Sequence, residues 1–256
     1  MKKSLRFLAP VAAIGLAVLL PGVASASSST TYQAKLNPLN HVANGFGSAT
    51  VTINGNQAMV SEQVTGLAAM FMGAPYPHAQ HIHGMAMGEC PSATADKNDD
   101  QVVSTTEGAP FYGPITTTLS TSGDTSPKAA LNLKTAPSGG SYTYRRMITL
   151  DAATLATVRA GKGVIVVHGL DPATLSKKAQ GEKSDLAPTL PLAATSPALC
   201  GALVASQTSR VPGGAANTGG GGTAGLEDGQ SLALGGVLLL ASGAVFALRR
   251  RFASES

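Results

Sequence analysis

The chain has 256 residues, of which 43% are hydrophobic and 12% charged, and its formal net charge is +4. All of this excess lies near the two ends, because residues 27–205 carry eleven basic and eleven acidic side chains. A central segment with no net charge, no basic block and no tryptophan excludes a surface built to bind nucleic acid. Its length is sufficient for one domain with a hydrophobic core.

The first segment, residues 1–26, is typical of a secretory signal peptide. Three basic side chains precede an apolar run over Phe7–Leu20, and Ala24-Ser25-Ala26 offers the small residues of a cleavage site. The apolar run is too short for a membrane span. We therefore expect the chain to be exported.

Alternation of apolar and polar residues predicts a mostly β domain over residues 27–205. Two alternating runs, 48–54 and 57–64, are joined by a turn at Gly55-Asn56, and the Asn54-Gly55 pair is a strong hairpin signal. One helix is expected, capped by Asp151 and ended by Gly161. Many short strands favour an all-β fold, an antiparallel Greek-key-type β-sandwich with one short helix. Its further strands are predicted from Thr, Val and Ile content at 115–120, 129–133, 141–150 and 163–168.

Three of the five histidines fall within six residues, in the stretch Pro77–Gly84. If Gln80–His83 is a strand, His81 and His83 point to the same face. Two imidazoles on one face are half of a copper or zinc site. His168, at the end of a second strand-like run, is the candidate third ligand.

The loop after the histidines has the spacing of a 12-residue calcium loop. The departure is Gln101 at position 6, where glycine usually provides the turn. The flanking prolines are unlike an EF-hand, so we expect a rigidifying site and not a sensor; a solvated acidic loop is the alternative. The candidate calcium ligands are Asp96, Asn98, Asp100, the carbonyl of Val102, Ser104 and Glu107.

The chain has two cysteines, Cys90 and Cys200. An even count in an exported protein favours one disulfide, and the alternative is a pair of thiolate metal ligands. The disulfide would close a loop of about 110 residues, for which the chain-entropy relation gives roughly 4–5 kcal/mol as an upper value.

The C-terminal part predicts an anchor. Residues 206–230 form a Gly-rich linker. Residues 231–248 are apolar and are expected to form a transmembrane helix, with a buried core helix as the alternative; three arginines follow in a basic cytoplasmic tail, 249–256. Within the linker, Ala215–Gly219 is similar to the sorting signals of Gram-positive actinobacteria. We expect the domain to be displayed outside the cell, anchored to the cell membrane or the cell wall.

The spacing of histidines and cysteines resembles the copper/zinc superoxide dismutase family. The motifs are His78-x-x-His81-x-His83-Gly84, then Cys90, Val166-Val167-His168 and Cys200-Gly201. In that family the His-x-His strand supplies two copper ligands and the Val-Val-His strand another. The resemblance implies a dismutase-like sandwich with copper on His81, His83 and His168. The stretches Gly47–Ile53, Val64–Leu67 and His81–Gly84 are also similar to the related CHRD (chordin-type) domain.

Two features of the dismutases are missing. No histidine lies between His83 and His168, so the bridging ligand and the zinc ligands are absent, and we expect no zinc. No arginine precedes Cys200-Gly201 to attract superoxide. The first hypothesis is therefore a non-catalytic binding or structural module that holds one copper and one calcium, with an unidentified cell-envelope or extracellular partner. The alternative is an extracellular copper superoxide dismutase, and a third reading is a metal-free group of hydrogen-bonded histidines.

Overall fold

The structure is a computed structural model that describes residues 29–40 and 44–206. The predicted signal peptide, the linker from residue 207 onward, the apolar segment 231–248 and the tail lie outside these residues. Within them, no helix is long and apolar enough to cross a membrane. The strands are β1 (Thr30–Pro38), β2 (Phe46–Asn54), β3 (Gln57–Thr65), β4 (Met70–Phe71), β5 (Ala74–Pro75), β6 (Gln80–His83), β7 (Ile115–Thr118), β8 (Tyr142–Thr149), β9 (Val164–His168), β10 (Pro197–Ala202) and β11 (Val204–Ala205).

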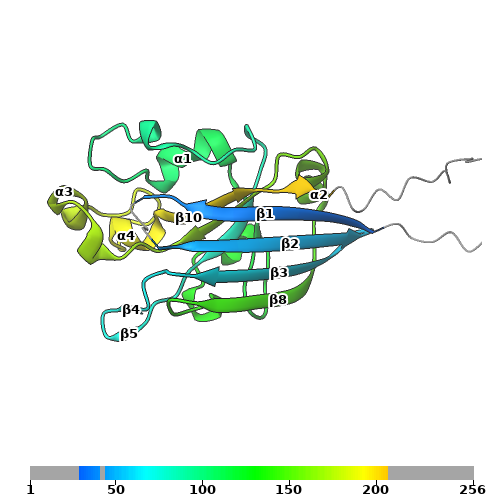
Figure 1. Cartoon of the computed structure of the whole chain (residues 1–256), viewed down its shortest axis with the longest axis horizontal. Helices are drawn as coiled ribbons and strands as arrows, with labels where there is room; N and C mark the ends of the chain where they lie inside the picture. The colour runs from blue at the N-terminus through cyan, green and yellow to red at the C-terminus, as the bar shows by residue number, and fades with distance from the viewer. Residues whose placement is uncertain (1–28, 41–43, 207–256) are drawn as a thin grey trace, which may run out of the picture. The chain divides into compact units, whose positions relative to one another are not determined.

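One antiparallel sheet carries most of the described chain (Figure 1). Eight strands follow one another in the order β7-β6-β9-β10-β1-β2-β3-β8, and β11 pairs with β1. The sheet is continuous because β1 has two neighbours on one side of it: Asn37 and Pro38 pair with β10, whereas Tyr32 and Gln33 pair with β11. The sheet curls into a half-barrel, and the core lies on its concave face. The expected all-β, antiparallel class is confirmed in this form.

Alternating side chains build that core. In β2 the buried residues are Ala49, Val51 and Ile53, and the residues between them are exposed or half-buried. The other half of the sheet is buried on both faces: Ile165 and Val167 join the main core, whereas Val164 and Val166 pack with Tyr112 on the outer face. One inward position of β3 is not apolar: the acidic side chain of Glu62 points into the core and is only 1% exposed.

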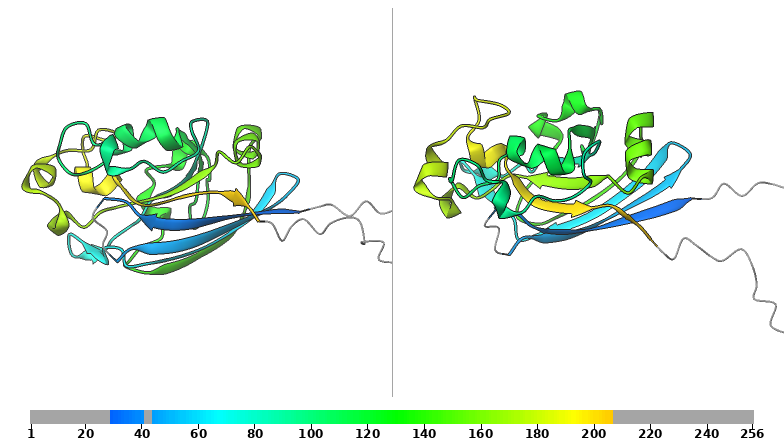
Figure 2. Two further views of the ribbon diagram at one scale, coloured as in Figure 1. Left: turned by 45° about the horizontal axis from the view of Figure 1, so that its top comes forward. Right: turned by 90° about the horizontal axis from the view of Figure 1, so that it is seen from above.

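Helix α1 (Thr105–Tyr112) packs on the outer face of the β6–β9–β10 half, and α4 (Leu192–Thr195) reaches His168 on that face. Tyr112 of α1 packs on β9, and the carbonyl of Thr195 in α4 accepts a hydrogen bond from His168. Figures 1 and 2 show α1 on the β10 side of the sheet, away from β2, β3 and β8. The remaining helices are α2 (Ala152–Arg159), α3 (Lys177–Gly181) and the 3₁₀ helices Ala93–Ala95, Pro127–Ala129, Leu133–Thr135 and Pro172–Thr174.

Several local predictions are confirmed. Asn54 pairs with Gln57 across a two-residue turn, and Gly55 takes the positive φ of 62° that this turn requires. The helix predicted after Asp151 is α2, where the Asp151 side chain accepts the N–H of Thr154 and Gly161 follows at φ 70°. Strands β7, β8 and β9 occupy three of the four further predicted runs.

Two local predictions are wrong. Residues 129–133 are not a strand, because Ala129 and Ala130 close tight 3₁₀ turns onto Ser126 and Pro127. The expectation of one helix also fails. Helix α1 carries Gly108 and Pro110, which weaken any helical signal, yet Ser104 and Glu107 cap it reciprocally.

The predicted disulfide between Cys90 and Cys200 is confirmed. It ties the loop after β6 to β10 across 110 residues of sequence, with the two Cα atoms 5.8 Å apart. A structural disulfide is typical of an extracytoplasmic protein. Cys200 itself pairs with Val166 of β9, the strand that carries His168.

Candidate metal centre

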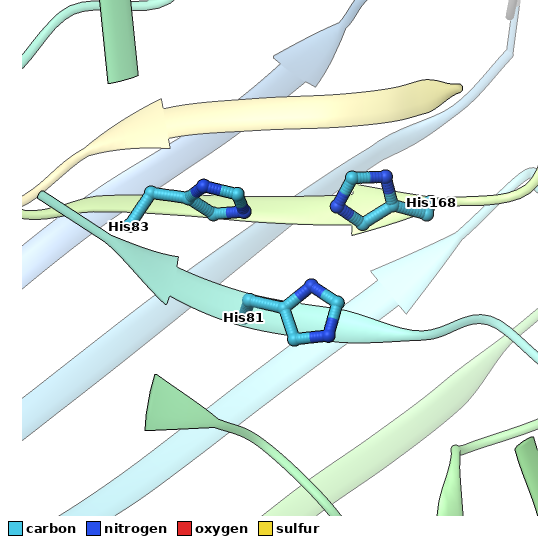
Figure 3. Close-up of side chains that lie close together, drawn as sticks. All are labelled: His81, His83 and His168. Atoms are coloured by element: carbon cyan, nitrogen blue, oxygen red, sulfur yellow. The ribbon is translucent and has the colours of Figure 1, made fainter. Parts of the chain in front are cut away.

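Strands β6 and β9 bring His81, His83 and His168 together. In the ladder, His81 lies opposite Val166 and His83 opposite Val164, so both histidines share the outer face with those valines and with His168, two residues further along β9. One ligand nitrogen from each ring lies within 4.8 Å of the other two. Figure 3 shows one nitrogen of each ring pointing into the space between the rings.

A backbone carbonyl fixes the orientation of each ring. His81 donates from Nε2 to the Ala130 oxygen at 3.1 Å, His83 from Nδ1 to Gly113 at 2.8 Å, and His168 from Nδ1 to Thr195 at 2.6 Å. A carbonyl oxygen can only accept, so the nitrogen facing it must carry the proton. The second nitrogen of each neutral ring is then an unprotonated lone pair.

Those second nitrogens have no partner. Among the described residues, Nδ1 of His81, Nε2 of His83 and Nε2 of His168 are buried and accept no hydrogen bond. A buried polar atom left unpaired costs about 1–3 kcal/mol, and native proteins contain few of them. Three such atoms in one place are the donor set that a metal ion would satisfy.

The electrostatics keep these rings neutral. Burial, followed by the nearby His168 ring, lowers the pKa of His83 from 6.5 to about 3. Burial lowers the pKa of His168 to about 4, although its hydrogen bond to Thr195 acts in the opposite direction. For His81, burial and then the two neighbouring rings lower the pKa well below 6.5. At neutral pH no proton competes for the three lone pairs.

The geometry is close to that of a bound metal. A tetrahedral ion at about 2.0–2.1 Å from each nitrogen holds the nitrogens about 3.3 Å apart. The three nitrogens lie within 4.8 Å of one another, so the rings would turn inward to bring any wider pair to this spacing. Three protein ligands leave a fourth position open, as in catalytic metal sites. The three residues could therefore hold a metal ion.

His78 does not join this cluster. Its Nδ1 lies 2.9 Å from the carbonyl oxygen of His168 and its Nε2 lies 2.9 Å from that of Ala68, so neither nitrogen is free. The ring therefore supports the backbone at the end of β9.

The predicted calcium ligands lie in one loop, but their carboxylates already accept backbone N–H groups. Asp96 accepts from Asp99 and Gln101, and Glu107 accepts from Lys97 and Ser104. Among the described residues these side chains do not form a metal-sized cluster comparable to the histidines. Gln101 has φ 71°, the backbone conformation that position 6 of a calcium loop needs. The calcium site stays a prediction.

No protein-family model, curated protein or solved structure matches the chain. The resemblance to dismutases and CHRD domains therefore rests on the motifs alone, and function has to be argued from the site.

Proposed function

We propose that the chain is an extracytoplasmic copper-binding module. Copper would be held by Nδ1 of His81, Nε2 of His83 and Nε2 of His168. The observation that supports this most directly is the set of three buried, unprotonated and unpaired ring nitrogens that point toward one another. A metal-free group of histidines explains the three hydrogen bonds to carbonyl oxygens, but it leaves the other three ring nitrogens without a bonding partner.

Copper is favoured by the chemistry of the donors. Imidazole suits copper, zinc, nickel and iron, and among divalent ions Cu(II) binds such sites most strongly. The carbonyl partners raise the basicity of each ring and hold it in place. We also propose that the curled sheet is a variant of the dismutase-like sandwich, since its two halves share one core and the His-x-His and Val-Val-His strands lie side by side.

The test is copper loading of the full chain. We expect one equivalent of Cu(II) to give an electron paramagnetic resonance spectrum with coupling to three nitrogens, and Zn(II) to be displaced by copper. Superoxide turnover is measured on the same sample. Loaded copper without turnover supports the binding module, turnover supports the dismutase alternative, and the lack of a nitrogen-coupled signal would refute both.

A second cation is proposed in the loop 96–107. The positive φ of Gln101 supports this site. The loop also lies against Glu182, a further candidate ligand that the sequence pattern did not indicate. The neighbouring Asp100 carboxyl raises the pKa of Glu182, first through a hydrogen bond between the two groups, and crowded carboxyls of this kind are relieved by a cation.

We expect calcium to give a binding heat in calorimetry with the full chain, and Glu107→Gln to abolish it. Glutamine at this position keeps the capping box of α1, so the variant removes charge without removing the cap. Equal calcium heats for the two proteins would contradict a site that uses Glu107.

Surface display completes the proposal. The confirmed disulfide supports an extracytoplasmic location. Attachment to the membrane or the cell wall through residues 206–256, and an envelope or extracellular partner, rest on the sequence pattern alone.

A further inference from the structure

A small cavity lies directly against the metal ligands. Its volume is ≈ 20 Å³, and both His81 and His168 line it. That volume has room for about one water-sized molecule. Since three histidines leave a coordination position open, we infer that this cavity holds the exogenous ligand of the metal proposed above, and that it admits small uncharged molecules and excludes anions.

The other walls of the cavity are apolar. They are formed mainly by Ile115, Leu131, Leu133, Leu186 and Leu190. Leu131 and Leu186 are 45% and 48% exposed, so they lie where the cavity meets the surface. A molecule that reaches the metal must pass these leucines and lose its water shell. For an uncharged diatomic this costs little, whereas an anion loses solvation that apolar walls do not replace.

No polar side chain is available to receive an anion there. Thr105 and Thr195 also line the cavity, but Thr105 donates its hydroxyl to the Thr195 carbonyl and Thr195 donates to Ser184, both at 2.6 Å. No lysine or arginine is among the lining residues. Lys134 follows Leu133 in the chain but is exposed.

A carboxylate lies close to this wall of the cavity. Asp185 accepts the N–H of Thr106 at 2.9 Å, directly after Thr105 of the cavity wall. Burial raises the pKa of Asp185 itself, but hydrogen bonds from Thr106 and Ser104 outweigh it and the net pKa is lowered. The Asp185 carboxylate is therefore ionised and opposes the attraction that the metal exerts on an anion.

The experiment compares an uncharged and an anionic probe on the copper-loaded full chain. Carbon monoxide is added after reduction to Cu(I) and followed by its infrared stretch. Azide is added to the Cu(II) form and followed by its charge-transfer absorption. We expect a carbon monoxide adduct and weak azide binding. Leu186→Lys, which adds a cation at the mouth, should tighten azide binding about 10-fold by a short-range charge interaction.

Met147→Lys is the matched control. Met147 is 54% exposed on β8 and does not line the cavity, so it adds the same charge elsewhere. We expect it to leave azide binding unchanged. The inference is overturned if the unmodified chain binds azide as tightly as Leu186→Lys, if Met147→Lys has the same effect, or if no carbon monoxide adduct forms on bound copper. If copper itself gives no nitrogen-coupled signal, the proposed metal centre fails first.

Discussion

Replacing His168 with alanine is expected to weaken copper binding at least about 100-fold. Loss of a group that only orients a ligand costs 10–100-fold in metal affinity, and His168 would be a ligand itself. Its removal leaves two nitrogens on one strand and opens the wall of the cavity. The affinity is measured by competition with a copper chelator, and the number of coupled nitrogens in the resonance spectrum should fall from three to two.

His78→Ala is the matched control for this prediction. His78 is another buried histidine, in the segment that precedes β6, but neither of its nitrogens is free. Its loss should lower stability and leave the number of coupled nitrogens at three. If the two variants lost copper affinity equally, His168 would not be a ligand.

The histidine strands could be predicted because a strand imposes a period of two. His81-Ile-His83 and the apolar run before His168 needed only that rule to share a face. The tautomers could not be predicted. They depend on the carbonyls of Gly113, Ala130 and Thr195, which any residue type provides, brought from three segments that are distant in the sequence.

The segment 104–107 shows how one pattern supports two structures. Ser104 and Glu107 fit positions 9 and 12 of a calcium loop, and they equally fit the Ser-x-x-Glu of a helix cap. The structure uses them as the cap of α1. The continuous sheet could not be predicted from the sequence either. Alternation identifies the two faces of β1, but it does not give the long-range register that pairs β1 with both β2 and β10.

Glu62 is the inward position that the same alternation could have revealed, since it shares its face with Ala58, Val60 and Val64. Among the described residues neither carboxylate oxygen has a hydrogen-bond partner. Burial raises the pKa of Glu62 from 4.5 to about 8. The folded chain therefore keeps a proton that the unfolded chain releases between these two values, and stability should fall as the pH rises through this range.

Glu62→Gln is expected to remove that loss. Glutamine has the size of the protonated side chain and cannot ionise. The variant should match the unmodified chain near pH 4 and exceed its free energy of unfolding by about 5 kcal/mol at pH 9, from about 1.4 kcal/mol per unit of pKa shift. Denaturant titrations across this range give the difference. Glu89→Gln, a change of the same kind at an exposed position, should show none.

In the copper-free chain, the three histidines change the free energy of unfolding with pH in the opposite direction to Glu62. Their pKa values are lowered, so the stability that comes from keeping them neutral is present above pH 6.5 and is lost as the pH falls. Three histidines outweigh one glutamate below pH 6.5, and Glu62 acts without opposition above it. The copper-free chain should therefore be most stable near pH 6.5. Glu62→Gln should remove the decline above this pH and steepen the rise between pH 4.5 and 6.5, where Glu62 opposes the histidines. If the alkaline decline persists in Glu62→Gln, Glu62 is not the group that sets it.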